Sequence, residues 1–251
     1  MSERDISHLL VDWPYESGRI NVRLIEGTDG HQKMQVRIEM GIMQLELEGR
    51  PDGLRPEGSD SWLDHHLARR ERYVQEGGRL EDFVLSPAEC RQLREEAVQF
   101  YHRYMGLFVL EAYEGVIRDT NRNLAVLDLC RDHAADDSDR QILEQFRAYI
   151  IMMRTRAEAT RAVIGGHPKI ALAAIDRGLE QIRSAFDDLG QGDVFDESNE
   201  VELLRGMRDA LVPKLPTSQR IELQERLKAA LDAENYELAA ILRDELRMLD
   251  D

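Results

Sequence analysis

The stretch from Ser86 to Val109 reads SPAECRQLREEAVQFYHRYMGLFV and predicts a long amphipathic helix. Ser86, with Pro87 next and Glu89 three positions on, forms a capping box with proline at the first helical position. Apolar side chains then recur every three or four residues, which is the period of one helix face. The pattern continues to about Arg118, with Gly106 as a point where it can break. The apolar face consists of Leu93, Ala97, Phe100, Tyr101, Tyr104 and Phe108.

Further helices are predicted on both sides of this stretch. Upstream, Ser59, Asp60 or Ser61 can cap a helix that ends at the glycine pair 77–78. Downstream, we expect a helix junction at 119–123, where Asp, Thr and Asn side chains interrupt the apolar run, and a loop at 134–138. The segment 139–187 is expected to form an αα-hairpin around a Gly-Gly-His-Pro turn. The downstream helices are expected at about 124–130, 139–163, 168–186 and 199–212.

Before residue 58 the apolar residues alternate with a period of two, which is typical of strands. Runs at 20–24 and 34–40 flank the turn sequence Gly-Thr-Asp-Gly at 27–30 and predict an antiparallel hairpin. The apolar phase shifts by one residue after Gly41, which indicates a β-bulge or a break before a third run. We expect two or three strands between about 18 and 50. The predicted fold class is mainly α with a small N-terminal antiparallel β-hairpin or meander, α+β overall.

The charge balance excludes some classes of function. The 251 residues carry 49 acidic and 33 basic side chains, a formal net charge of -16. Such a surface repels phosphates, so direct nucleic-acid binding is disfavoured. The two cysteines, Cys90 and Cys130, stand alone in helical patterns and are expected to be buried free thiols. With no apolar segment long enough to span a bilayer and no signal sequence, we expect a cytoplasmic protein without membrane contact.

The sequence contains no recognisable motif for catalysis, cofactor binding or metal binding, so we predict no catalytic residue, no cofactor and no metal site. His65 and His66 are adjacent on a helix and point about 100° apart, so they would not chelate one ion together. The most enzyme-like patch consists of Glu111, Glu114, Arg118, Asp119 and Arg122. Because residues three or four apart share a helix face, we interpret it as an ion network in which Glu111 and Glu114 pair with Arg118.

The final segment, 217–251, predicts two short helices joined by a tight turn. It follows Pro213-Lys214-Leu215-Pro216, which sets a boundary because residues before proline are pushed out of helical space. Thr217 or Ser218 can cap the first helix, and the second begins near Tyr236. Two such helices are expected to fold as an antiparallel hairpin.

The second of these helices carries the most specific motif of the chain. Residues 234–249 read ENYELAAILRDELRML. The ordered run of Tyr-Glu-x-Ala-Ala-x-Leu-Arg-Asp resembles the UVR motif of the UvrB and UvrC excision-repair proteins. The resemblance covers about one seventh of the chain. Outside it, the helix pairs resemble tetratricopeptide arrays only weakly, because no repeat period is visible.

The resemblance implies a bacterial protein that docks other proteins. UVR hairpins also occur in some Clp ATPases and in the McsA adaptor, where they pair through apolar faces, in part as coiled coils. The implied partner is another UVR-containing protein or a second copy of this chain. An alternative is that the hairpin belongs to the chain's own core. The candidate partner-binding residues are Leu223, Leu227, Leu231, Tyr236, Glu237, Ala239, Ala240, Leu242, Arg243, Asp244, Leu246 and Leu249.

Together these patterns predict three domains. Residues 1–58 form the β-hairpin or meander, 59–214 a helical bundle or tetratricopeptide-like array, and 215–251 the UVR hairpin. The leading hypothesis for function is a non-enzymatic adaptor in DNA excision repair or stress proteolysis. The alternative is an enzyme whose site lies in the helical body and is regulated by the hairpin.

Overall fold

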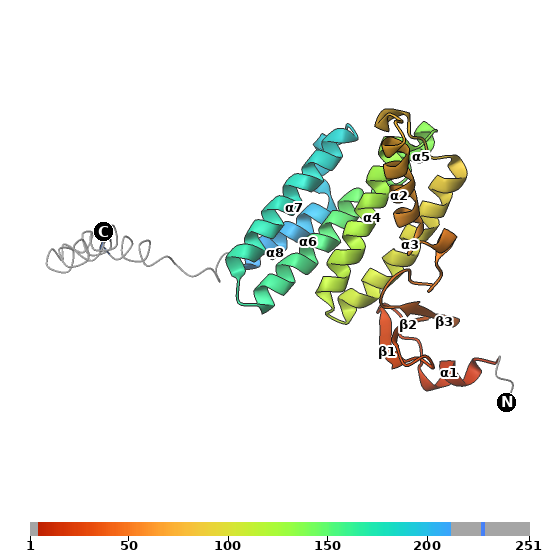
Figure 1. Cartoon of the computed structure of the whole chain (residues 1–251). Helices are drawn as coiled ribbons and strands as arrows, with labels where there is room; N and C mark the ends of the chain where they lie inside the picture. Colours follow the sequence, from red (N-terminus) through yellow and green to blue (C-terminus); the bar gives the residue numbers. More distant parts are fainter. Residues whose placement is uncertain (1–4, 212–226, 229–251) are drawn as a thin grey trace, which may run out of the picture. The chain divides into compact units, whose positions relative to one another are not determined.

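The computed structural model describes residues 5–211 and 227–228 (Figure 1). Contacts divide the chain into two compact units, Met1–Arg208 and Asp209–Asp251, and each is described by itself. The first unit combines a small sheet with a layer of helices. The predicted fold class, mainly α with an N-terminal antiparallel sheet, is confirmed.

The N-terminal sheet has three antiparallel strands in the order β1-β2-β3: β1 Asn21–Glu26, β2 Gln32–Ile38 and β3 Gly41–Glu46. A short helix, α1 (Ser7–Asp12), precedes them. Met34 on β2 lies opposite Leu24 on β1 and Leu45 on β3. The phase shift predicted at Gly41 is a break, because the chain turns there between β2 and β3.

The helices pack as neighbours in a simple order, α2 on α3, α3 on α4, α4 on α6 and α6 on α7 (Figure 1). The sheet packs against α3 through β1 and β2. The bounds are η1 Pro56–Gly58, α2 Trp62–Gln75, η2 Leu80–Asp82, α3 Pro87–Val109, α4 Tyr113–His133, α5 Asp137–Gln141, η3 Glu144–Phe146, α6 Arg147–Ile164, α7 Pro168–Asp188, η4 Gly192–Glu197 and α8 Asn199–Leu211.

The prediction of a helix junction at 119–123 is wrong, because α4 runs through these residues without a break. Three of the polar side chains that suggested a cap, Asp119, Thr120 and Asn123, are buried and bonded inside the helix layer. The Thr120 hydroxyl donates to the Val116 carbonyl at 2.6 Å, and the Asn123 Nδ2 donates to the Ala97 carbonyl at 2.9 Å. The real break between α3 and α4 lies at 110–112, where Glu111 takes a left-handed backbone with φ 58°.

The structure of residues 134–163 also differs from the prediction of one loop followed by one helix. A short α5 and a 3-10 turn precede α6, which begins at Arg147. The segment after α4 is held by Leu85, whose N–H donates to the His133 carbonyl at 2.8 Å and whose carbonyl accepts from Ala135 at 2.9 Å. The αα-hairpin predicted at 139–187 is present as α6 and α7.

Both cysteines lie in the core between α3 and α4, as buried free thiols. The sequence-based expectation for Cys90 and Cys130 is therefore confirmed. The neighbouring Cys90 thiol, together with burial, raises the pKa of Cys130 above its ordinary value. Cys130 is thus held as an uncharged, apolar side chain at neutral pH.

Candidate functional site

The predicted partner-binding residues all lie outside the described residues except Leu227. Leu227 is helical and half-buried, and its neighbour Lys228 is helical and exposed. That difference is the one expected of an amphipathic helix, in which adjacent residues point about 100° apart.

The most highly charged interior site joins α3 to α4. Arg103 donates from Nε and Nη2 to the two carboxylate oxygens of Asp119, at 2.7 and 2.8 Å. The remaining Arg103 nitrogen, Nη1, donates to the carbonyls of Glu46 and Gly49, at 3.0 and 2.7 Å. Arg103 is 1% exposed and Asp119 is 0% exposed. The pair therefore holds the end of β3 and the following loop against the helices.

A second buried carboxylate, Glu96 on α3, extends this charged site to α2. Its two oxygens accept from the backbone N–H groups of Trp62 and Leu63, at 2.8 and 3.2 Å. A carboxylate at a helix N-terminus accepts hydrogen bonds from the free N–H groups and is stabilised by the positive end of the helix dipole. Arg122 on α4 donates to Glu96 at 2.8 Å and also to the Ser61 hydroxyl.

The enzyme-like patch predicted from the sequence is brought together only in part. Arg118, Asp119 and Arg122 line one small cavity of about 170 Å³. Arg118 donates to Asp119 at 3.0 Å and to Glu48 at 2.8 Å, not to an acid on its own helix face. Glu111 lies in the α3–α4 turn, and exposed Glu114 is 3.8 Å from Arg161.

The arginines and acids of this cavity bond mainly to one another. Such mutual pairing orders α2, α3, α4 and the β3 end, and leaves each carboxylate neutralised by a guanidinium. Sequence reasoning missed Arg103 and Glu96, because each sits in an amphipathic pattern that gives no sign of which charged residue faces inward.

His66 on α2 is buried, and neither ring nitrogen has a hydrogen-bond partner among the described residues. Its ring stacks on Trp62 with centroids 5.9 Å apart, and Nδ1 lies 4.0 Å from a carboxylate oxygen of Glu89. Burial, reinforced by the charge of Arg69, lowers the pKa of His66 from 6.5 to about 4. His66 is therefore neutral at physiological pH. Within the described residues, no three His, Cys, Asp or Glu side chains gather closely enough to hold a metal ion.

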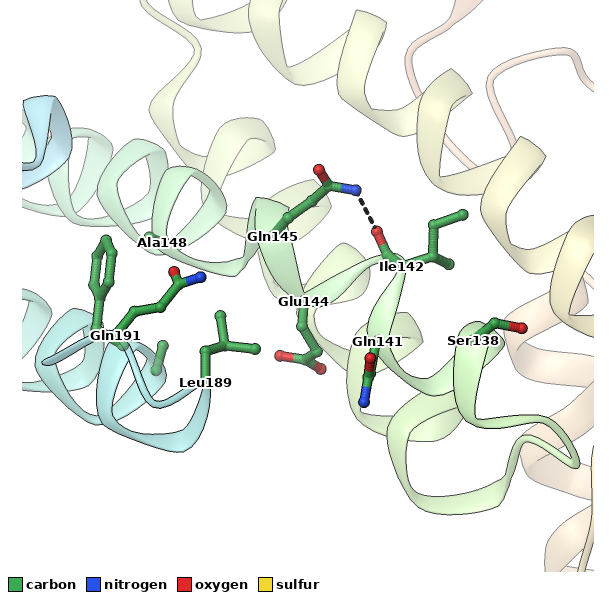
Figure 2. Close-up of a pocket in the computed structure, with 10 residues that line it drawn as sticks. Ser138, Gln141, Ile142, Glu144, Gln145, Ala148, Leu189 and Gln191 are labelled. Carbon is green, nitrogen blue, oxygen red and sulfur yellow. Dashed lines mark hydrogen bonds between the residues drawn. The ribbon is translucent and has the colours of Figure 1, made fainter. Parts of the chain in front are cut away.

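A cavity of about 580 Å³ lies between the α5–η3 segment and the C-terminal end of α7 (Figure 2). Leu189 and Gln191 line one side, and Gln141 and Glu144 the other. The carboxylate of Glu144 accepts two hydrogen bonds from Arg147, the one from Nη2 at 2.7 Å. The Gln145 Nε2 donates to the Ile142 carbonyl at 2.8 Å, shown as a dashed line in Figure 2. The acid of this cavity is thus already neutralised, which does not suit acid–base chemistry.

No helix in the described part of the chain has both the length and the apolar character needed to cross a membrane. Comparison with known proteins finds one family, the UvrB/uvrC motif (UVR), which matches residues 217–251. Neither the curated proteins nor the solved structures include a match to this chain. The matched residues coincide with the hairpin predicted after Pro216, and the rest of the chain matches no family. Residues 217–251 are therefore a UvrB/uvrC motif, carried at the C-terminal end of this sequence.

Proposed function

We propose that this protein is a non-enzymatic adaptor that binds another protein through the UVR hairpin at 215–251. The observation that carries the proposal is the match of residues 217–251 to the UvrB/uvrC motif, a module for protein–protein contact. The docking face consists of the apolar and motif residues named above, among them Leu227.

Physical chemistry supports docking as the role of so short a segment. Two helices of this length cannot enclose the apolar side chains that their sequence supplies. The exposed remainder is stabilised by packing on a second helical surface, which is the helix-in-groove mode of recognition. The partner is a second UVR hairpin, either on another protein or on a second copy of this chain. The processes that the motif suggests are DNA excision repair and stress proteolysis.

The arrangement of the helical body supports an adaptor over an enzyme. Arg118, Asp119 and Arg122, the most enzyme-like residues of the sequence, are bonded to one another or to neighbouring elements. Each therefore has a structural role that accounts for its burial and charge.

The test is light scattering on the full chain, with Leu227→Glu and Lys228→Gln as a matched pair. Both substitutions lower the net charge by one unit, but Leu227 is half-buried and Lys228 is exposed. We expect wild type and K228Q to associate, with themselves or with an added UVR hairpin from another protein, and L227E to lose that association while keeping its melting temperature. If L227E instead unfolds the body, or associates as wild type does, the hairpin is not a docking module.

A further inference from the structure

A groove runs along one exposed stripe of α3. Val98, Tyr101 and Met105 lie three and four residues apart and so share one face of the helix. Two cavities lie along this stripe, one of about 500 Å³ and one of about 300 Å³, and Tyr101 and His102 line both. One end of α3 packs on the sheet (Figure 1). The smaller cavity is lined in part by β2 and β3, and the larger by α4, η3 and α6.

The larger cavity is apolar and aromatic. Tyr101 contacts Tyr104 edge to face, with ring centroids 5.4 Å apart, and lies 6.3 Å from the ring of Tyr149. Val98, 53% exposed, and Phe146, 50% exposed, also line it. Tyrosines and other large apolar side chains around a cavity are typical of surfaces that bind a partner's side chain.

One polar group in this apolar cavity has an unused hydrogen-bonding atom. Asn123 is 3% exposed, lines the cavity and donates from Nδ2 to the Ala97 carbonyl. Its Oδ1 has no hydrogen-bond partner in the described part of the chain. A buried acceptor without a donor is costly, so a donor that arrives with a bound molecule gains this hydrogen bond.

The smaller cavity holds a buried cation. Arg37 on β2 is 7% exposed and donates from Nε to the Trp13 carbonyl at 2.9 Å. Nη1 donates to backbone carbonyls, including those of Glu39 at 3.2 Å and Gly41 at 3.0 Å. Among residues 5–211 and 227–228, no carboxylate lies within ion-pair distance of Arg37, and Nη2 makes no hydrogen bond. The guanidinium is therefore hydrogen-bonded but not neutralised.

The groove also differs in charge from the chain as a whole. Its lining includes Arg19, Arg37 and Arg94 but only one acid, Glu39. Burial lowers the pKa of His102, which also lines the groove, below its ordinary value, so this ring adds no positive charge at neutral pH. The whole sequence has 49 acidic and 33 basic residues. Arg94 pairs with Asp139, and Arg19 lies 3.7 Å from Glu16, so Arg37 is the groove arginine with an unsatisfied charge in the described structure. A complementary occupant carries a negative charge.

We propose that this groove binds an acidic peptide segment of a protein partner. An aromatic or branched apolar side chain of the segment fills the larger cavity, a backbone N–H donates to Asn123 Oδ1, and a carboxylate pairs with Arg37 Nη2. The distance along α3 from residue 94 to residue 105 is about 16 Å at 1.5 Å per residue. An extended peptide of about five residues spans that length at about 3.3 Å per residue.

The residues that line the groove all belong to the first unit, and none is part of residues 215–251. An adaptor that docks through the hairpin gains a second binding surface on its body. Since the variants below leave residues 215–251 unchanged, failure of the groove proposal and failure of the docking proposal are distinguishable.

The test is fluorescence anisotropy of the full chain with two labelled pools of seven-residue peptides. Every peptide has Leu, Phe or Trp at the same two positions. The remaining positions are Asp or Glu in the acidic pool and their neutral isosteres, Asn or Gln, in the control pool. A charge-assisted hydrogen bond to Arg37 predicts that the acidic pool binds about tenfold more tightly. Replacing Arg37 by Met is expected to remove that preference, with folding checked by circular dichroism.

A surface variant keeps the proposal testable if R37M fails to fold. Val98→Glu adds a negative charge at the larger cavity, and Val84→Glu makes the same change outside the groove at a side chain that is also 53% exposed. We expect V98E to abolish binding of the acidic pool and V84E to retain it. Equal binding of the two pools, no binding of either, or equal effects of V98E and V84E would overturn the proposal.

Discussion

Arg103 on α3 and Asp119 on α4 form a doubly hydrogen-bonded ion pair in the interior, with N–O distances of 2.7 and 2.8 Å and almost no solvent exposure. Because Arg103 also donates to the Glu46 and Gly49 carbonyls, the same guanidinium joins two helices to the end of the sheet. Burying an ion pair costs desolvation energy for both groups. Removing one partner leaves the other charge buried without a counter-ion, so the loss of either residue alone is expected to destabilise the fold.

Asp119→Asn is therefore expected to destabilise the protein by about 3–5 kcal/mol, because it leaves the Arg103 charge buried without a counter-ion. Urea denaturation measures the change. The control is Asp128→Asn, which removes a half-exposed acid that lies 2.9 Å from Arg147. Exposed pairs contribute about 1 kcal/mol or less. Similar losses for D119N and D128N would contradict the role of the buried pair.

Gly178 on α7 lies directly against Thr155 on α6. A Cβ at this position would collide with the Thr155 hydroxyl and lie 2.7 Å from its methyl carbon. We expect Gly178→Ala to cost about 1–3 kcal/mol from overpacking, although Gly→Ala normally stabilises a helix by about 1 kcal/mol.

Two further variants separate packing from helix propensity in that experiment. A Cβ at Gly206 on α8 would meet no atom of the described residues within 4 Å, so Gly206→Ala is expected to stabilise the protein. The double variant G178A/T155A removes the colliding groups, so it should recover part of the loss relative to the sum of the single changes. Strict additivity in thermal melts would show that the two residues do not touch.

The buried ring of His66 makes the free energy of unfolding depend on pH. Its pKa is about 4 in the folded protein and 6.5 when exposed, because burial and the Arg69 charge favour the neutral ring. The unfolded chain then binds the extra proton first, so this stabilisation is complete above pH 6.5 and is lost as pH falls from 6.5 to 4. The loss is about 2–3 kcal/mol over that window.

The measurement is the free energy of unfolding of wild type, His66→Leu and His65→Leu from pH 7 to pH 4. H66L is expected to flatten the curve relative to wild type, since the titrating ring is gone. H65L, the same change one residue earlier, keeps the His66 contribution. If H66L and wild type lose stability in parallel, the buried ring does not supply the acid dependence.

The capping box that opens α3 is expected to contribute about 1 kcal/mol. The Ser86 N–H donates to a Glu89 carboxylate oxygen at 2.7 Å, and the Ser86 hydroxyl accepts from the Glu89 N–H. Ser86→Ala removes the second bond and should lower the urea midpoint. Ser138 is an exposed residue of α5, where no side-chain cap is formed, so Ser138→Ala should change stability by about 0.5 kcal/mol or less.

Local rules determined many of the elements. The capping box placed the start of α3. Residues 59–61 offered three caps for α2, of which the structure uses Ser61, and the phase shift after Gly41 indicated a β-bulge or a break, of which the structure shows the break. Each of these signals is complete within a few neighbouring residues, so it needs no information about distant parts of the chain. The UVR motif is readable for the same reason, since its residues follow one another in order.

Tertiary contacts decided what those rules could not. Asp119, Thr120 and Asn123 have the composition of a cap, yet α4 passes through them because Arg103 and the Ala97 carbonyl, both on α3, supply partners from another helix. The groove on α3 is likewise absent from the sequence pattern, because Arg37 and Tyr101 are 64 residues apart and meet around one cavity only through the packing of β2 on α3. Sequence determined which residues are polar or apolar, and the fold alone decided which of them face one another, because burial is set by neighbours distant in the chain.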